Sequence, residues 1–180
     1  MTPRQWIPAT LIAALLSAGP ALAQTAAKDE PVAKHGDWAV FVVGKPKECY
    51  LGTLPASSTA KRGGKTVTVE RGDIRLYVTF RPAEGVVNEI SFKSGYPIKA
   101  GNAAKLAVGS ETYNLNPGAG ESDGWAWPGS AAEDATIVAA LRKGAKATVT
   151  ALSARGTTTT DVFSLIGITA ALGDAEARCR

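Results

Sequence analysis

Residues 74–80 read Ile-Arg-Leu-Tyr-Val-Thr-Phe, and the strict alternation of this stretch decides the fold class. Its first, third, fifth and seventh residues are apolar and fall on one face of an extended chain. One apolar face and one polar face are typical of an antiparallel sheet with a buried side and a wet side. Residues 86–93 repeat the alternation, and Arg-Pro-Ala-Glu-Gly at 81–85 supplies turn residues. The two stretches are therefore predicted to form a hairpin.

Short stretches of β type recur about every ten residues along the rest of the chain, a spacing that predicts a sandwich or barrel. With the two stretches above, they occupy residues 38–43, 49–54, 66–70, 105–108, 111–115, 125–127, 147–153, 158–165 and 168–172. One segment, residues 131–143, is predicted to be a helix, because Ser130 and Glu133 form a capping box and Gly144 follows the last turn. The predicted fold class is an all-β, antiparallel β-sandwich of roughly ten short strands with one short α-helix.

The chain is predicted to be exported and to form one domain. Residues 1–23 carry an early base, a short apolar run and a small-x-small cleavage site, the three parts of a signal peptide. Removal of these residues from the 180-residue chain leaves 157, the size of one domain. Residues 24–35 lack periodicity and are predicted to be a flexible lead-in, and residues 36–180 to be the sandwich domain. An uncleaved N-terminal anchor is the alternative for residues 1–23.

Composition and charge exclude several classes of protein. A hydrophobic fraction of 45% with 20% charged residues indicates a globular chain rather than a disordered one. The net charge is only +4 and no block of five like charges occurs, so a nucleic-acid partner is not expected. His35 is the only histidine, which excludes multi-histidine metal sites and leaves one candidate base for a Ser-His-Asp arrangement. Glu121 and Asp123 form at most a weak calcium loop, and an acidic surface turn is favoured. No metal, cofactor or catalytic residue is predicted.

Cys49 and Cys179 are the only cysteines. In the oxidising compartment that an exported protein reaches, two cysteines form a disulfide by default. Two free thiols or an intermolecular bridge remain alternatives, since Cys179 lies one residue from the C-terminus.

Trp125 and Trp127 alternate on a predicted strand, so their rings face the same side. Two neighbouring rings could stack on a sugar or receive an apolar side chain of a partner. These two residues are the possible ligand contacts that the sequence offers. The alternative is that both rings pack in the core or under the helix that begins after Ser130.

The order of several short motifs resembles that of the invasion-associated locus B family of exported bacterial proteins. The motifs are Gly36-Asp37-Trp38, residues 46–50, 77–82, 88–92 and 95–97, Trp125 to Trp127, and residues 132–134, 141–144 and 153–156. The resemblance implies an all-β sandwich in the periplasm or on the outer membrane, in a family named for a member linked to entry into host cells. It implies no reaction, cofactor or catalytic residue. The paired cysteines that this family often shows favour a bridge between Cys49 and Cys179.

These observations predict a non-enzymatic protein of the bacterial periplasm or outer surface that acts as a binding or adhesion module. Its expected partner is an envelope protein, a glycan or a host-surface ligand. The alternative function is an envelope enzyme that acts on glycans through a pair of carboxylates, which sequence alone cannot locate.

Overall fold

The computed structural model describes residues 30–118 and 124–180, and the predicted signal peptide and the Glu121 to Asp123 turn lie outside these residues. The elements, in chain order, are β1 (Ala33–His35), β2 (Trp38–Val43), β3 (Glu48–Thr53), β4 (Ser57–Arg62), β5 (Lys65–Thr66), β6 (Arg75–Arg81), a 3₁₀ turn (Pro82–Glu84), β7 (Val86–Lys93), β8 (Ala104–Val108), β9 (Glu111–Pro117), β10 (Trp125–Trp127), α1 (Ala131–Lys143), β11 (Lys146–Leu152), β12 (Thr158–Ser164) and α2 (Ile168–Arg178). The predicted antiparallel all-β class is confirmed.

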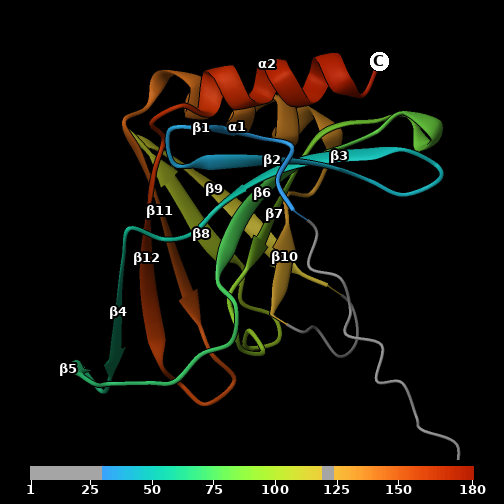
Figure 1. Cartoon of the computed structure of the whole chain (residues 1–180). Helices are drawn as coiled ribbons and strands as arrows, with labels where there is room; N and C mark the ends of the chain where they lie inside the picture. The colour runs from blue at the N-terminus through green and yellow to red at the C-terminus, as the bar shows by residue number, and fades with distance from the viewer. Residues whose placement is uncertain (1–29, 119–123) are drawn as a thin grey trace, which may run out of the picture.

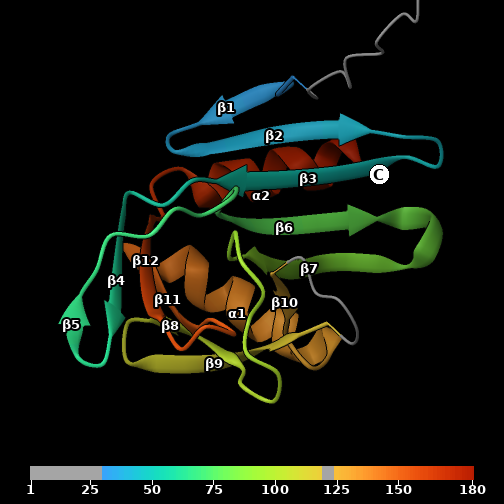
Figure 2. The same ribbon diagram turned by 90° about the horizontal axis from the view of Figure 1, so that it is seen from below.

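The strands follow one hydrogen-bonded order, β1-β2-β3-β6-β7-β10-β9-β8-β11-β12-β4-β5, and each pairing along it is antiparallel. Strand β9 joins the two halves, because it pairs with β10 near its end and with β8 along its length. In Figure 1 strands β1, β2 and β3 run across the upper part beneath α2, β6 and β7 run obliquely through the middle, and β11, β12 and β4 run downward on the left. Figure 2 shows the first half in full view with α2 behind it.

The predicted hairpin of β6 and β7 is confirmed, with Val78 opposite Ile90 and Leu76 opposite Phe92. All four side chains are buried. Helix α2 packs on β2 and β3, and α1 packs on β7, so both helices cover the buried face of this half. The opposite face of β2, β3, β6, β7 and β10, which points away from α2, is called the outer face below.

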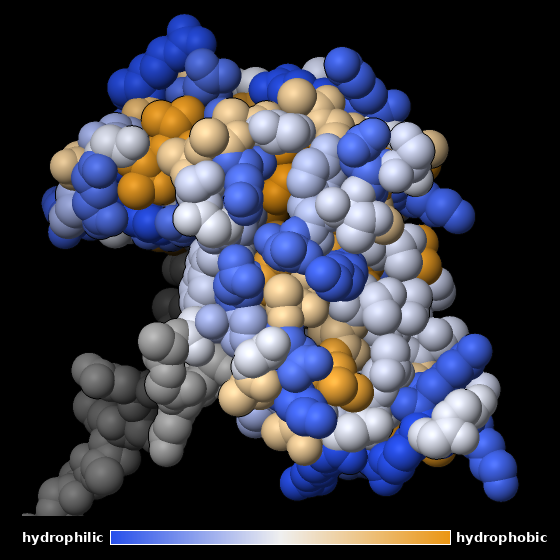
Figure 3. Space-filling view, turned by 180° about the vertical axis from the view of Figure 1, so that it is seen from behind, coloured by the Kyte–Doolittle hydropathy of each residue, from blue (hydrophilic) through white to orange (hydrophobic). Residues whose placement is uncertain are grey.

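One hydrophobic core extends through both halves of the sheet. Phe92 on β7 meets Phe163 on β12 edge to face, with ring centroids 6.2 Å apart. Trp38 on β2 is fully buried, and its indole N–H donates to the carbonyl of Ser164 at 3.1 Å. In the space-filling view from behind, the upper part overhangs the lower part, and hydrophobic residues form small patches among hydrophilic ones (Figure 3).

The second helix, α2, corrects the prediction of a strand over residues 168–172 and of a single helix in the chain. Its buried residues are Ile168, Ala171, Leu172 and Ala175, which recur at intervals of three, one and three as one helix face requires. Two of the four are alanines, which differ little in hydrophobicity from their neighbours. The helical period is therefore hard to detect in the sequence of this segment. Helix α1 has the predicted bounds, with the hydroxyl of Ser130 accepting from the backbone N–H of Glu133.

Three strand assignments also differ from the prediction. Strand β1 lies within the expected lead-in 24–35, so the ordered domain begins before Gly36. Strand β4 was not predicted because only Ala60 among its six residues is buried, which leaves no alternation to detect. The strand expected over 66–70 is reduced to β5, a two-residue strand that pairs only with the end of β4.

Candidate functional site

Strand β10 presents the two predicted ligand-contact residues on the outer face. Trp125 and Trp127 are half-buried, whereas Ala126 between them is fully buried in the core. The two indole rings lie 6.0 Å apart between centroids, at an angle of 18°. Neither ring belongs to the hydrophobic core cluster, and Trp127 lines a cavity together with Ser130 and Ala131 at the start of α1.

The two tryptophans are the end of a longer series of aromatic rings. Tyr77 on β6 lies 5.5 Å from Trp125, Tyr50 on β3 lies 6.0 Å from Tyr77, and Phe41 on β2 stacks on Tyr50 at 4.7 Å. These five residues, Phe41, Tyr50, Tyr77, Trp125 and Trp127, form what we call the aromatic row. It crosses the outer face from β2 to β10, the face that is turned toward the viewer in Figure 2.

The register of the strands explains why the rings meet. Tyr77 lies between Gly52 on β3 and Ser91 on β7, neither of which has a bulky side chain. A Cβ atom built on Gly52 would lie 2.8 Å from Cδ1 of Tyr77, so the tyrosine ring covers the backbone of β3. Partial burial raises the pKa of the Tyr77 phenol. The absence of a side chain at Gly52 therefore allows the row to be continuous across β3.

Charged side chains border the aromatic row. The ammonium group of Lys93 lies 5.1 Å from the centroid of the Trp125 ring, within the range of a cation–π contact. Arg75 pairs with Asp73 at 2.9 Å, and Arg81 binds both carboxylate oxygens of Glu89 at 3.0 and 3.1 Å. An apolar strip with polar groups at its rim is the usual composition of a recognition surface.

A cavity of about 300 Å³ opens beside Trp127, and two carboxyl groups, those of Glu89 and Asp134, line it. Asp134 in α1 is buried and accepts a hydrogen bond of 2.8 Å from the backbone N–H of Ile90. Burial raises the pKa of the Asp134 carboxyl, the hydrogen bond from Ile90 lowers it, and the charge of Glu89 raises it further. The sequence alone does not bring Asp134 and Glu89 together, because their proximity depends on the packing of α1 on β7.

The other candidate residues have structural partners. His35 hydrogen-bonds to Asp174 of α2 at 3.0 Å, which ties β1 to α2. Cys49 and Cys179 form the predicted disulfide, with Cα atoms 5.8 Å apart, which joins β3 to the end of α2. Within residues 30–118 and 124–180, no group of three or more His, Cys, Asp or Glu side chains could hold a metal ion.

None of the helices in the described part of the chain has the length and apolar composition needed to cross a membrane.

The described residues form an antiparallel β protein with two helices on one face of the sheet and an aromatic row on the other. A disulfide joins β3 to the end of α2. No protein-family model and no curated protein matches the chain. A solved structure does: the chain is similar to the crystal structure of invasion associated protein B from Bartonella henselae, with a TM-score of 0.54 and 18% sequence identity. The similarity covers 81% of this chain and 95% of the other, and it shows that the two proteins share a fold.

Proposed function

We propose that this protein is an exported, non-catalytic binding module of the bacterial envelope, and that the aromatic row is its contact surface for a glycan. The fold that it shares with invasion associated protein B supports an envelope protein. The signal-peptide pattern of residues 1–23 and the Cys49–Cys179 disulfide support an oxidising compartment outside the cytoplasm.

The observation that carries the proposal is the continuity of the row across the outer face. From β2 to β10 the row passes over five neighbouring strands, and the centroids of successive rings lie 4.7, 6.0, 5.5 and 6.0 Å apart. A sugar ring has apolar C–H faces and a perimeter of hydroxyl groups. The partly exposed rings of the row offer surfaces for the former; they are those of Tyr50, Tyr77, Trp125 and Trp127, whereas Phe41 is buried beneath Tyr50. Arg75, Glu89 and Lys93 at the rim offer hydrogen-bonding groups for the latter. An extended oligosaccharide therefore fits this surface better than a compact ligand does.

Binding can be measured by calorimetry with the purified protein and two soluble probes, a tetrasaccharide of N-acetylglucosamine and one of glucose. Trp125→Ala should lower the affinity for the bound probe about tenfold, because it removes the ring between Tyr77 and Trp127, and a well-packed aromatic contact contributes more than 1 kcal/mol. Ile166→Ala is the matched control, since Ile166 is 68% exposed on the loop before α2. Equal affinities of the wild type and Trp125→Ala for these probes would contradict the proposal.

Location can be tested separately by protease treatment of cells that produce the protein. Digestion in intact cells would place the domain on the outer surface. Digestion only after the outer membrane is opened would place it in the periplasm and exclude direct contact with a host cell. Resistance after lysis of the outer membrane, with loss on rupture of the inner membrane, would contradict export.

A second candidate function, a glycan-cleaving enzyme, is favoured by the cavity that Glu89 and Asp134 share beside Trp127. Glycoside hydrolysis uses one carboxyl group that holds a proton and one that stays ionised. The raised pKa of Asp134 suits the first role, and the pairing of Glu89 with Arg81 suits the second. Release of reducing ends from either tetrasaccharide, abolished in Asp134→Asn, would replace the binding proposal with this one. Binding without cleavage would contradict it.

A further inference from the structure

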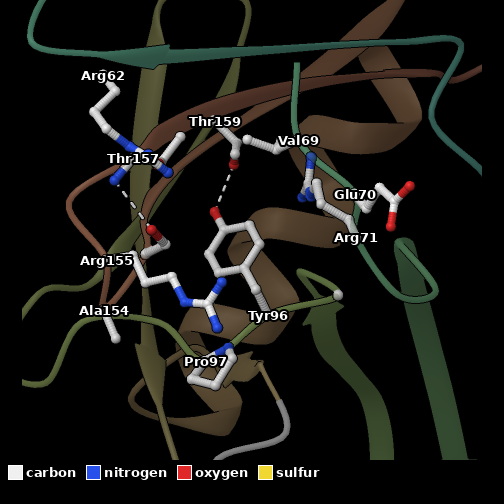
Figure 4. Close-up of a pocket in the computed structure, with 12 residues that line it drawn as sticks. Arg62, Val69, Glu70, Arg71, Tyr96, Pro97, Ala154, Arg155, Thr157 and Thr159 are labelled. Atoms are coloured by element: carbon white, nitrogen blue, oxygen red, sulfur yellow. Dashed lines mark hydrogen bonds between the residues drawn. The ribbon is translucent and has the colours of Figure 1, made fainter. Parts of the chain in front are cut away.

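A cavity of about 340 Å³ lies where the loops that flank β6 and β7 meet β4 and β12, and no residue of the aromatic row lines it. Its walls come from the end of β4, the loop before β6, the loop after β7 and the turn between β11 and β12. Figure 4 shows the Tyr96 ring standing in this cavity, with the guanidinium of Arg155 beside it and Arg62 beyond Thr157. A volume of this size accommodates a small organic ligand.

The inner wall of the cavity is held in place by Arg71. Its guanidinium binds both carboxylate oxygens of Asp161 at 2.7 Å and donates to the carbonyl of Ser94 at 2.6 and 3.0 Å. It also lies 4.9 Å from the centroid of the Tyr96 ring. The phenol of Tyr96 shares a hydrogen bond of 2.5 Å with the hydroxyl of Thr159. Asp161 neutralises the charge of Arg71, so the role of Arg71 is to position the ring of Tyr96. The positive charge that binds an anionic ligand must then come from other residues.

Two further arginines supply an unbalanced positive charge. Among the described residues, neither Arg62 nor Arg155 has a carboxylate within salt-bridge distance. Arg62 donates from Nε and Nη2 to the hydroxyl oxygen of Thr157, at 2.9 and 2.7 Å, which fixes the direction of its guanidinium. Thr157 is 3% exposed and accepts both of these bonds, so a buried group holds the Arg62 guanidinium in place. Glu70 also lines the cavity, but Figure 4 shows its carboxylate turned away from Arg62 and Arg155.

We propose that this cavity binds a phosphomonoester group. Such a group carries a charge between −1.5 and −2 near neutral pH, with three acceptor oxygens, and Arg62 and Arg155 together carry +2. The planar guanidinium group matches the oxygens of phosphate with two parallel hydrogen bonds. Lys65, the cross-strand partner of Arg62 on the β4–β5 hairpin, adds positive charge beside Arg62. The ring of Tyr96 provides an apolar contact for whatever carries the phosphate.

The probes are inorganic phosphate, glycerol 3-phosphate and vesicles of phosphatidylcholine with phosphatidic acid, each titrated into the purified protein at low salt. Binding of glycerol 3-phosphate is expected at micromolar to millimolar concentrations. Arg155→Gln should weaken it at least about tenfold, because charge-assisted hydrogen bonds to the phosphate are lost. Binding of the vesicles but not of glycerol 3-phosphate would assign the phosphate to a lipid headgroup, and the reverse would assign it to a soluble molecule.

Arg142→Gln is the matched control, since it removes the same charge from the last turn of α1, outside the residues that line this cavity. If Arg155→Gln and Arg142→Gln weaken binding equally, or if no probe binds, the proposal is overturned. The Arg155 side chain makes no ion pair with the residues that the structure describes, so its variant is expected to fold normally. Trp125→Ala should bind glycerol 3-phosphate as the wild type does, which separates this proposal from the glycan site.

Discussion

Arg71 and Asp161 form a buried ion pair that fastens the β5–β6 connection to the middle of β12. Two hydrogen bonds of 2.7 Å join the two groups, and the exposed fractions of their side chains are 7% and 0%. The hydroxyl of Ser58 donates a further bond of 2.7 Å to Asp161. Strands β4 and β12 and the loop before β6 thus meet at one carboxylate, beneath the cavity that Tyr96 occupies.

Asp161→Asn should lower the free energy of unfolding by about 3 to 5 kcal/mol, because it leaves the guanidinium of Arg71 buried without its counter-charge. Urea denaturation followed by circular dichroism measures the change. Asp73→Asn, which breaks the more exposed pair with Arg75, should change stability by less than about 1 kcal/mol. Similar values for the two variants would mean that the buried pair contributes little to the fold.

Reduction of the Cys49–Cys179 disulfide should lower the free energy of unfolding by about 4 to 5 kcal/mol. The bond closes a loop with a sequence separation of 130 residues, and in the chain-entropy model such a cross-link restricts the unfolded state strongly. The measurement is urea denaturation of the oxidised protein and of the protein kept reduced without alkylation of its thiols. The Cys49→Ala/Cys179→Ala variant is a further check, and an unchanged unfolding midpoint in both would contradict the prediction.

The strands that the sequence predicts are those with one buried and one exposed face. Residues 74–80 alternate because β6 lies inside the sheet with its apolar side on the core. Strands β1, β4 and β5 lie at or next to the ends of the strand order and bury few side chains, so hydrophobic patterning contains little information about them. Helix α2 was not predicted because alanines at 171 and 175 occupy positions where larger apolar residues usually mark a buried helix face.

The candidate sites show a different limit. The sequence alone predicts that Trp125 and Trp127 lie on one face, because the alternation of side chains is a property of a single strand. The contact between Tyr77 and Trp125 depends on the register of three strands, which nothing in either local sequence specifies. The cavity of Arg62 and Arg155 likewise combines residues 93 positions apart in the chain. Sites of this kind become visible only when the long-range pairing is known.

Asp134→Asn should stabilise the protein at neutral pH relative to the wild type. Burial raises the pKa of the Asp134 carboxyl in the folded state. The folded state therefore binds more protons than the unfolded state between the ordinary pKa of aspartate, about 3.9, and the raised value. The stability of the wild type falls as the pH rises through this window, whereas asparagine does not titrate. Urea denaturation between pH 3 and pH 8 should show the two proteins diverging in this window.

Asp134→Ala is the matching variant for the hydrogen bond. Asparagine can still accept from the backbone N–H of Ile90, but alanine leaves that buried N–H without an acceptor. The free energy of unfolding should fall by about 1 to 3 kcal/mol. A stability equal to that of Asp134→Asn would show that the bond to Ile90 does not hold α1 against β7.

Gly52→Ala should disturb the aromatic row without replacing any of its residues. The new methyl group would lie 2.8 Å from Cδ1 of Tyr77, too close for a normal contact, so the ring must move away from β3. Overpacking of this kind lowers the free energy of unfolding by about 1 to 3 kcal/mol. Near-ultraviolet circular dichroism should change, because it reports the mutual orientation of Tyr77 and Trp125.

Gly173→Ala is the control for this substitution. Gly173 lies on the exposed side of α2, and a Cβ atom there meets nothing within 4 Å. In a helix interior alanine is favoured over glycine by about 1 kcal/mol, so this variant should be more stable than the wild type. Opposite signs for the two glycine-to-alanine changes are expected because one methyl group enters solvent and the other enters the space of Tyr77. A neutral Gly52→Ala with an unchanged near-ultraviolet spectrum would mean that Tyr77 does not lie over β3 in solution, and the continuity of the aromatic row across β3 would be lost with it.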